Sequence, residues 1–86
     1  MPRVSSFFGI VIEMYFADHP PPHFHAKYSG EEAKIEIATG ELLSGSLSPR
    51  SLRLIREWLE LHRAELELNF ERVENEEQPL RIEPLK

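Results

Sequence analysis

The spacing of the apolar residues changes at Ser48-Pro49, and this change limits the possible folds more than any other feature of the sequence. Before this point apolar and polar residues alternate, as in strands with one buried face, and after it apolar residues recur at helical spacing to about Phe70. A serine followed by proline favours a helix start, because the hydroxyl caps a free amide and proline fits the first helical position. We therefore expect an α+β fold in which an antiparallel three- to four-stranded sheet packs on one long C-terminal helix.

Four segments of alternating apolar residues precede this helix. They are Phe7–Phe16, His23–Tyr28, Ala33–Ala38 and Leu42–Leu47. The first predicts one strand whose core face carries Phe8, Ile10, Ile12, Met14 and Phe16. The run from Asp18 to Pro22 ends that strand, because its three prolines donate no backbone hydrogen bonds.

The next two segments predict a hairpin with a four-residue turn at Ser29–Glu32. Because the pairing register follows from the length of the turn, this turn would place His25 opposite Glu36 and Lys27 opposite Lys34.

A chain of 86 residues is long enough for one domain, and we expect residues 1–86 to form a single folded unit. Residues 71–79 are rich in glutamate and end in proline, which predicts an acidic, solvated linker after the helix. Residues 80–86 form a C-terminal tail with apolar side chains at Leu80, Ile82 and Leu85. We expect this tail either to add an edge strand to the sheet or to lie along the helix.

The composition argues against several classes of protein. The chain has no cysteine, which removes disulfides, thiolate zinc sites and cysteine nucleophiles. Its formal net charge is −5, whereas nucleic-acid binding needs a basic surface, so direct nucleic-acid binding is not expected beyond a local patch. No apolar run reaches the length of a membrane span, so we expect no membrane segment and a cytoplasmic location.

The most distinctive stretch of the sequence is the run of histidine and proline from His19 to His25. Because His23 and His25 are two positions apart on an expected strand, their imidazoles project from the same face. We expect this to be the outer face, pointing away from the helix, with Glu36 or Glu13 within hydrogen-bonding reach of one imidazole.

Three interpretations of this motif stay open. A metal site would offer a divalent transition-metal ion the candidate ligands His19, His23, His25 and Glu36, and in the other two interpretations no cofactor is needed. A metal-free acid–base site acting on RNA would use the candidate catalytic residues His23, His25, Tyr15, Glu36 and Lys27. In the third interpretation the motif is structural, and its prolines form a rigid loop that packs against Tyr15. This interpretation is favoured because the outer face of an antiparallel sheet is ordinarily polar and solvated without any special function.

The segment Asp18–Tyr28, followed by Gly30–Ile35, resembles the signature of a bacterial family described as a domain of unknown function, DUF4160. The segment Val4–Tyr15, the start of the helix at Ser48, Trp58 and the closing Arg81–Leu85 fit the same pattern, so the resemblance spans nearly the whole chain. The resemblance implies no established activity. Members are often encoded beside another small protein of unknown function, which suggests a toxin–antitoxin-like pair of genes.

A second apolar stripe on the expected helix points to a partner. The first stripe contains Leu52, Ile55, Leu59, His62, Leu66 and Phe70. Leu54, Leu61 and Leu68 repeat every seven residues on the side away from it, and Trp58 lies between the two stripes. A sheet covers one stripe, so we expect these four residues to form an interface with a protein partner or a second copy, unless the C-terminal tail covers them. The leading functional prediction is a protein-interaction module. The alternatives are a small metal-independent ribonuclease-like toxin and a metal-binding hydrolase.

Overall fold

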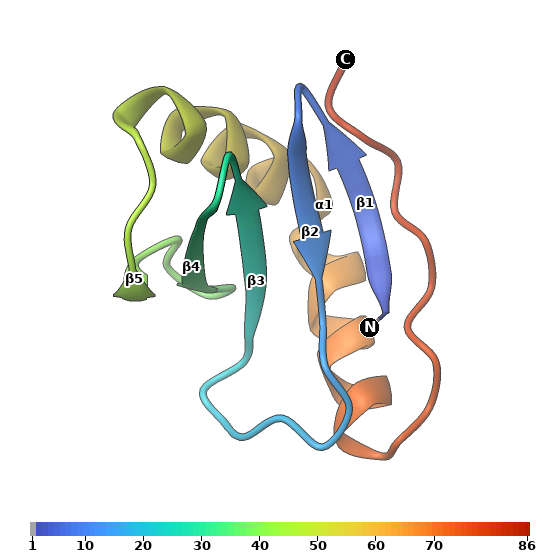
Figure 1. Ribbon diagram of the computed structural model, residues 1–86. Coiled ribbons are helices and arrows are strands. Elements are labelled where there is room, and N and C mark those ends of the chain that lie inside the picture. The colour runs from blue at the N-terminus through green and yellow to red at the C-terminus, as the bar shows by residue number, and fades with distance from the viewer. Residues whose placement is uncertain (1) are drawn as a thin grey trace.

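The structure is a computed structural model that describes residues 2–86. Five strands form one antiparallel sheet in the order β1-β2-β3-β4-β5, and a long helix follows them. The elements are β1 (Arg3–Phe7), β2 (Ile10–Glu13), β3 (His23–Tyr28), β4 (Glu31–Glu36), β5 (Leu42–Gly45) and α1 (Pro49–Glu74). Helix α1 crosses behind the sheet, and the hydrophobic core lies between these two layers (Figure 1). The predicted α+β class is confirmed, with one strand more than the upper limit of the prediction.

The single strand predicted from Phe7 to Phe16 is wrong, because the chain reverses within it and forms the β1–β2 hairpin. Phe7 pairs directly with Ile10, so the turn consists of Phe8 and Gly9. Both turn residues have positive φ, 50° at Phe8 and 82° at Gly9, which is the backbone conformation of the tightest hairpin turns.

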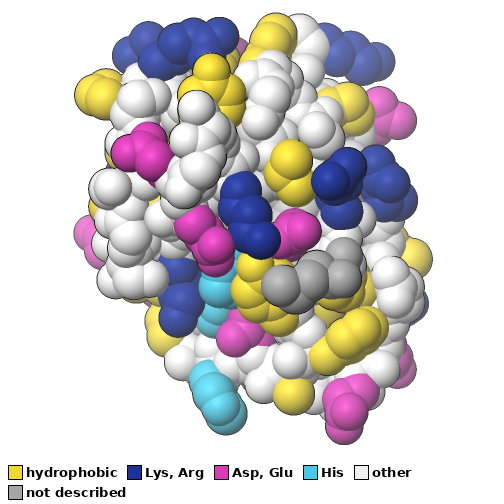
Figure 2. Space-filling model, viewed as in Figure 1, with side chains coloured by type: hydrophobic (Ala, Val, Ile, Leu, Met, Phe, Trp, Pro, Cys, Tyr) yellow, Lys and Arg dark blue, Asp and Glu magenta, His cyan; other side chains and the backbone are white. Residues whose placement is uncertain are grey.

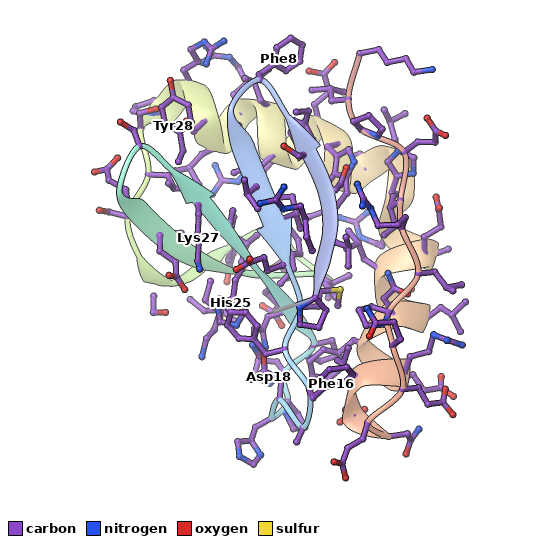
Figure 3. The ribbon with its side chains drawn as sticks, turned by 45° about the vertical axis from the view of Figure 1, so that its right-hand side comes forward. Phe8, Phe16, Asp18, His25, Lys27 and Tyr28 are labelled. Carbon is purple, nitrogen blue, oxygen red and sulfur yellow. The ribbon has the colours of Figure 1, made fainter. Side chains whose placement is uncertain are left out.

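The burial of the first hairpin follows the prediction in part. Ile10, Ile12 and Met14 are buried in the core as expected. Phe8 and Phe16 are 52% and 44% exposed, because each lies in a turn rather than in a strand. Phe8 projects from the tip of the hairpin (Figure 3).

The β3–β4 hairpin has a two-residue turn, Ser29-Gly30, where four residues were expected. The pairing register is therefore shifted by two positions, and the predicted pairs on the outer face are wrong. The observed pairs are His23 with Glu36, His25 with Lys34 and Lys27 with Glu32. Lys27 and Lys34 therefore do not face each other, and Lys27 lies opposite the acidic residue Glu32.

Helix α1 begins where predicted and ends later. The Ser48 hydroxyl accepts a hydrogen bond from the Ser51 amide, and Pro49 occupies the first turn. The helix continues to Glu74, so the linker predicted at residues 71–79 is shorter and begins only after this point. At His62 the backbone has φ −128° and ψ 22°, which interrupts the regular helix. Within residues 2–86, the structure contains no helix with the length and apolarity that a membrane span needs.

One side of α1 faces the sheet and the other keeps exposed leucines. Trp58 is fully buried and packs against Phe24, with 5.8 Å between the ring centroids. Its predicted role at an intermolecular interface is therefore corrected to a role in the core. Leu61 and Leu68 are 66% and 50% exposed, whereas Leu54 is partly buried against the core.

The C-terminal tail runs beside β1, on the side away from β2, without forming a strand (Figure 1). Three sets of hydrogen bonds fasten it: Ile82 N–H to the Val4 carbonyl at 2.8 Å, Trp58 Nε1–H to the Glu83 carbonyl at 2.8 Å, and the Asn69 amide to both backbone groups of Leu80. The Ile82 side chain is buried in the core. The tail therefore adds no strand to the sheet, and both β1 and α1 hold it.

Candidate functional site

Two buried histidines project from the same face of β3. Phe24 and Ala26 point into the core, so His23 and His25 point to the other side of the strand. The loop Met14–Pro22 joins β2 to β3 and brings Asp18 to these imidazoles (Figure 3). Figure 2 shows histidine atoms at the surface of this face, bordered by acidic and basic side chains.

The three side chains bring one potential metal-binding atom each to a common point. Asp18 Oδ2 lies 2.9 Å from His23 Nε2 and 3.2 Å from His25 Nε2. All three atoms lie within 4.8 Å of one another. Because both histidines are buried and Asp18 is partly exposed, this Asp18–His23–His25 cluster lies just below the protein surface.

The backbone of the proline run fixes the orientation of His23. Its Nδ1 lies 2.7 Å from the Pro21 carbonyl oxygen, and since a carbonyl only accepts, Nδ1 carries the hydrogen. In the neutral ring the lone pair is then on Nε2. This atom is buried and has no hydrogen-bond partner among residues 2–86, because the nearby Asp18 oxygen is close but poorly aligned.

Side chains rather than the backbone hold His25. Its ring stacks on Tyr15 with 4.1 Å between centroids and an interplanar angle of 30°. Its Nε2 faces Asp18, and its Nδ1 lies 3.4 Å from Glu32 Oε2. The ring therefore has a carboxylate near each nitrogen and an aromatic ring over one face.

An ion pair lies beside the cluster. Lys27 Nζ is 2.9 Å from Glu13 Oε1, which also accepts a hydrogen bond from the Tyr15 hydroxyl at 3.2 Å. Burial favours a higher pKa for Glu13, but the hydrogen bond and charge of Lys27 outweigh it and hold that pKa below the usual range. The hydrogen bond to Glu13 raises the pKa of Lys27. Burial, followed by the charges of Glu32 and Glu13, raises the pKa of Tyr15.

The structure brings together some of the residues proposed from the sequence. The His25 ring contacts both the Tyr15 ring and the His23 ring. Lys27 is linked to this group through its ion pair with Glu13. His19 is exposed, and the cluster does not include it. Glu36 also lies outside the cluster and instead accepts a hydrogen bond from Thr39.

The carboxylates near the imidazoles are Asp18 and Glu32, not the expected Glu36 or Glu13. The register accounts for Glu32, since the two-residue turn sets it opposite Lys27 and one row from His25. Asp18 directly precedes the histidine–proline motif, and aspartate is a common metal ligand. These two facts could have identified Asp18 as a candidate ligand from the sequence. Its position depends on the path of a long loop that alternation does not describe.

His23 shares the outer face of β3 with His25, but the expectation that it lies away from the helix is wrong. Its ring lies 5.6 Å from the ring of Phe70, near the end of α1, and only 2% of the residue is exposed. The reason is that α1 continues past Phe70 and the loop Met14–Pro22 packs on its end, through a hydrogen bond from Ala17 N–H to the Val73 carbonyl. His23 is thus enclosed between the loop, β3 and the helix.

The geometry of the cluster suits a transition-metal ion. Ligand bonds of about 2.0–2.2 Å at tetrahedral or octahedral angles separate neighbouring donor atoms by about 2.8–3.6 Å. The Asp18 oxygen is 2.9 and 3.2 Å from the two Nε2 atoms, and both distances lie within this range. The Pro21 carbonyl on Nδ1 of His23 is the second contact that metal-binding histidines commonly make.

Metal-free acid–base chemistry on RNA fits this arrangement less well. Lys27, the candidate residue whose positive charge could hold a phosphate, is already paired with Glu13. Asp18, Glu13 and Glu32 surround the imidazoles with negative charge, which repels a phosphate backbone. His23 is almost fully buried, so a substrate hydroxyl has no direct access to it.

Comparison with known proteins identifies a family. Residues 9–71 of the 86 match the family model described as "Domain of unknown function (DUF4160)", a range that contains the whole Asp18–His23–His25 cluster. No curated protein and no solved structure matches the chain. Because the match covers well over half of the chain, the resemblance noted in the sequence is confirmed, and the protein belongs to the DUF4160 family.

Proposed function

We propose that this protein binds one divalent transition-metal ion through Asp18 Oδ2, His23 Nε2 and His25 Nε2. The observation that carries the proposal is the buried Nε2 of His23, which has no hydrogen-bond partner among residues 2–86. If His23 Nε2 carries a lone pair, that lone pair faces a carboxylate oxygen 2.9 Å away. If Nε2 carries a hydrogen, the N–H is poorly aligned with the same oxygen and forms no hydrogen bond. A buried polar atom left in this way costs about 1–3 kcal/mol, and a cation between the three atoms removes that cost.

The ligand set narrows the choice of ion. Two imidazoles and one carboxylate suit Zn²⁺, Fe²⁺ or Ni²⁺ better than Mg²⁺ or Ca²⁺, which prefer oxygen ligands throughout. Three protein ligands are also the number that catalytic zinc sites use, with the next position open to water or substrate. Hydrolysis assisted by the bound metal is therefore the enzymatic role that this ligand set supports.

Isothermal titration calorimetry with Zn²⁺ and Ni²⁺ tests the proposal. We expect one ion per chain for the wild type and at least about 100-fold weaker binding for Asp18→Asn and for His25→Ala, because each removes one of three ligands. His19→Ala is the matched control, since this histidine belongs to the same motif but is exposed and outside the cluster. Absence of binding by the wild type, or an equal loss in His19→Ala, would rule the proposal out.

The exposed leucines support a second candidate function, that of a protein-interaction module. Leu61, Leu68 and Leu80 are 66%, 50% and 52% exposed, and Leu68 and Leu80 line one small groove. An antiparallel pair of α1 helices centred on Leu61 would set Glu57 against Glu65, so like charges oppose a second copy. We therefore propose a cytoplasmic partner whose apolar helix carries flanking Lys or Arg residues. In a toxin–antitoxin-like pair, it would be the neighbouring gene product.

Light scattering on the purified protein, alone and co-expressed with the neighbouring gene product, tests this second candidate. We expect a monomer alone and a stoichiometric complex that Leu61→Glu/Leu68→Glu prevents. Leu42→Glu/Leu43→Glu is the matched control, because these leucines are exposed on β5 instead. A wild-type homodimer, or equal loss of the complex in both double variants, would contradict the proposal.

A further inference from the structure

The two histidines of the cluster differ in what holds them. His23 is fixed by the Pro21 carbonyl and by burial against Phe70, both parts of the rigid fold. His25 has no such backbone contact among residues 2–86, and only side chains orient its ring. A metal ligand needs a fixed ring plane and a fixed tautomer, so the contacts of His25 decide how well it can serve.

Four side chains form a continuous chain of contacts around His25. Tyr15 covers one face of its ring and donates its hydroxyl to Glu13. Glu13 pairs with Lys27 at 2.9 Å, and Lys27 Nζ lies 4.0 Å from Glu32 Oε1. Glu32 Oε2 in turn lies 3.4 Å from His25 Nδ1, which closes the chain on the same imidazole.

The two ends of this chain act on His25 in different ways. The Tyr15 ring restricts rotation of the imidazole plane, and Glu13 holds Tyr15 in position. Without an ion, His25 Nε2 hydrogen-bonds to Asp18 Oδ2 at 3.2 Å. A metal ion bound at Nε2 would move the ring hydrogen to Nδ1, where the Glu32 carboxylate would accept it. The distance of 3.4 Å is long for a hydrogen bond, and the exposed Glu32 side chain can rotate to shorten it.

We infer that Glu32 is a positioning residue for the metal ligand His25, with the Tyr15–Glu13–Lys27 contacts supporting the same ring. This inference rests on the proposed metal-binding function. Lys27 is essential to the arrangement because it lies between Glu13 and Glu32 and offsets the repulsion between these two carboxylates. Glu32 was not among the residues proposed from the sequence, because the expected register placed it in a turn.

Zinc affinity of Glu32 variants, measured by competition with a chelating dye, tests the inference. We expect Glu32→Ala to weaken Zn²⁺ binding by about 10–100-fold, the usual effect of losing such a contact. Glu32→Gln should restore part of this affinity, because its amide oxygen still accepts the Nδ1 hydrogen. Glu31→Ala is the control, since the neighbouring Glu31 is exposed and forms no ion pair among residues 2–86.

A spectroscopic readout separates positioning from a general effect on stability. In the zinc-bound wild type, ¹⁵N resonances should show a single His25 tautomer with hydrogen on Nδ1, and Glu32→Ala should shift or broaden them while those of His23 stay unchanged. If the wild type binds zinc and Glu32→Ala binds equally well with unchanged resonances, the inference is wrong and the metal site stands. If the wild type binds no metal, the proposed function fails, and this inference fails with it.

Discussion

At the scale of single residues, Phe8 is the hairpin residue whose backbone conformation suits its side chain least. Its φ of 50° is rare for a bulky side chain, and Asn followed by Gly is preferred in this turn. We expect Phe8→Asn to raise the free energy of unfolding by about 0.5–1 kcal/mol, because the ring is half exposed and contributes little packing. Thermal unfolding should show a Tm higher by about 2–8 °C.

Ser29→Asn is the corresponding change in the other two-residue turn, where φ is also 50°. Since serine tolerates this conformation better than phenylalanine, Ser29→Asn should raise the Tm by less. A lower Tm for Phe8→Asn would mean that the Phe8 ring makes a contact worth more than the strain of the turn.

Glu13 gives a stability that depends on pH. Despite burial, Lys27 holds its folded pKa below the usual value, so the contribution of Glu13 is present above the unfolded pKa and is lost as pH falls through the folded pKa. We expect Glu13→Gln to lower the free energy of unfolding at pH 7 by up to about 1 kcal/mol, as for a solvent-screened pair. Urea unfolding should show this difference shrinking as the pH falls below the ordinary carboxyl range.

The control is Glu31→Gln, because Glu31 is exposed and forms no ion pair within the described chain. Its stability difference from the wild type should stay small and change little with pH. A Glu13→Gln difference that persists at low pH would show that packing, rather than the Lys27 pair, is lost.

At the scale of elements, the loop Met14–Pro22 links the candidate site to the end of α1. Ala17 N–H bonds to the Val73 carbonyl, and Asp18 reaches the histidines on β3. A bound ion would therefore tie the loop to the sheet. We expect Zn²⁺ at 100 times its dissociation constant to stabilise the fold by about 2.7 kcal/mol, with slower amide exchange across this loop.

Hydrogen exchange followed by mass spectrometry measures this effect directly. Asp18→Asn should abolish the zinc-dependent protection, because it weakens the one ligand that the loop supplies. Protection of α1 without protection of the loop would contradict the proposed connection.

The sequence predicts the elements well wherever polarity follows a single period. Strands β3 and β4 and the start of α1 lie close to their predicted positions. The first hairpin was missed because its turn residue Phe8 is apolar and continues the alternation of the strand. The end of α1 was missed because Glu71 and Glu74, on an exposed face of the helix, have the composition of a linker.

At the scale of the whole molecule, the C-terminal tail closes one side of the core. Ile82 is buried, whereas Leu80 in the same tail is 52% exposed. We expect Ile82→Ala to lower the free energy of unfolding by about 2–4 kcal/mol, because it leaves a cavity beside β1. Leu80→Ala should cost less than about 0.5 kcal/mol, as for an exposed position. Urea unfolding measures both, and equal losses would mean that the tail does not pack as described.

The candidate site could be predicted only in part, because its residues come together by two different routes. The face shared by His23 and His25 follows from strand alternation, which the sequence contains. Asp18 depends on the path of a nine-residue loop over the sheet, from Met14 to Pro22, and Phe70 depends on how far α1 continues. Such tertiary positions are set by packing between distant segments, which leaves no periodic trace in the chain.

The tail beside β1 also limits how these molecules can join. A sheet normally has two edges at which a further strand can add, and repeated addition at both produces fibres. Here the tail lies along the β1 edge, while β5 at the opposite edge is exposed over its length. Within residues 2–86, β5 is therefore the one edge of the sheet that no other segment lies along. Two molecules could meet edge to edge through β5, but a third would find no strand to extend, so such lateral growth stops at a pair.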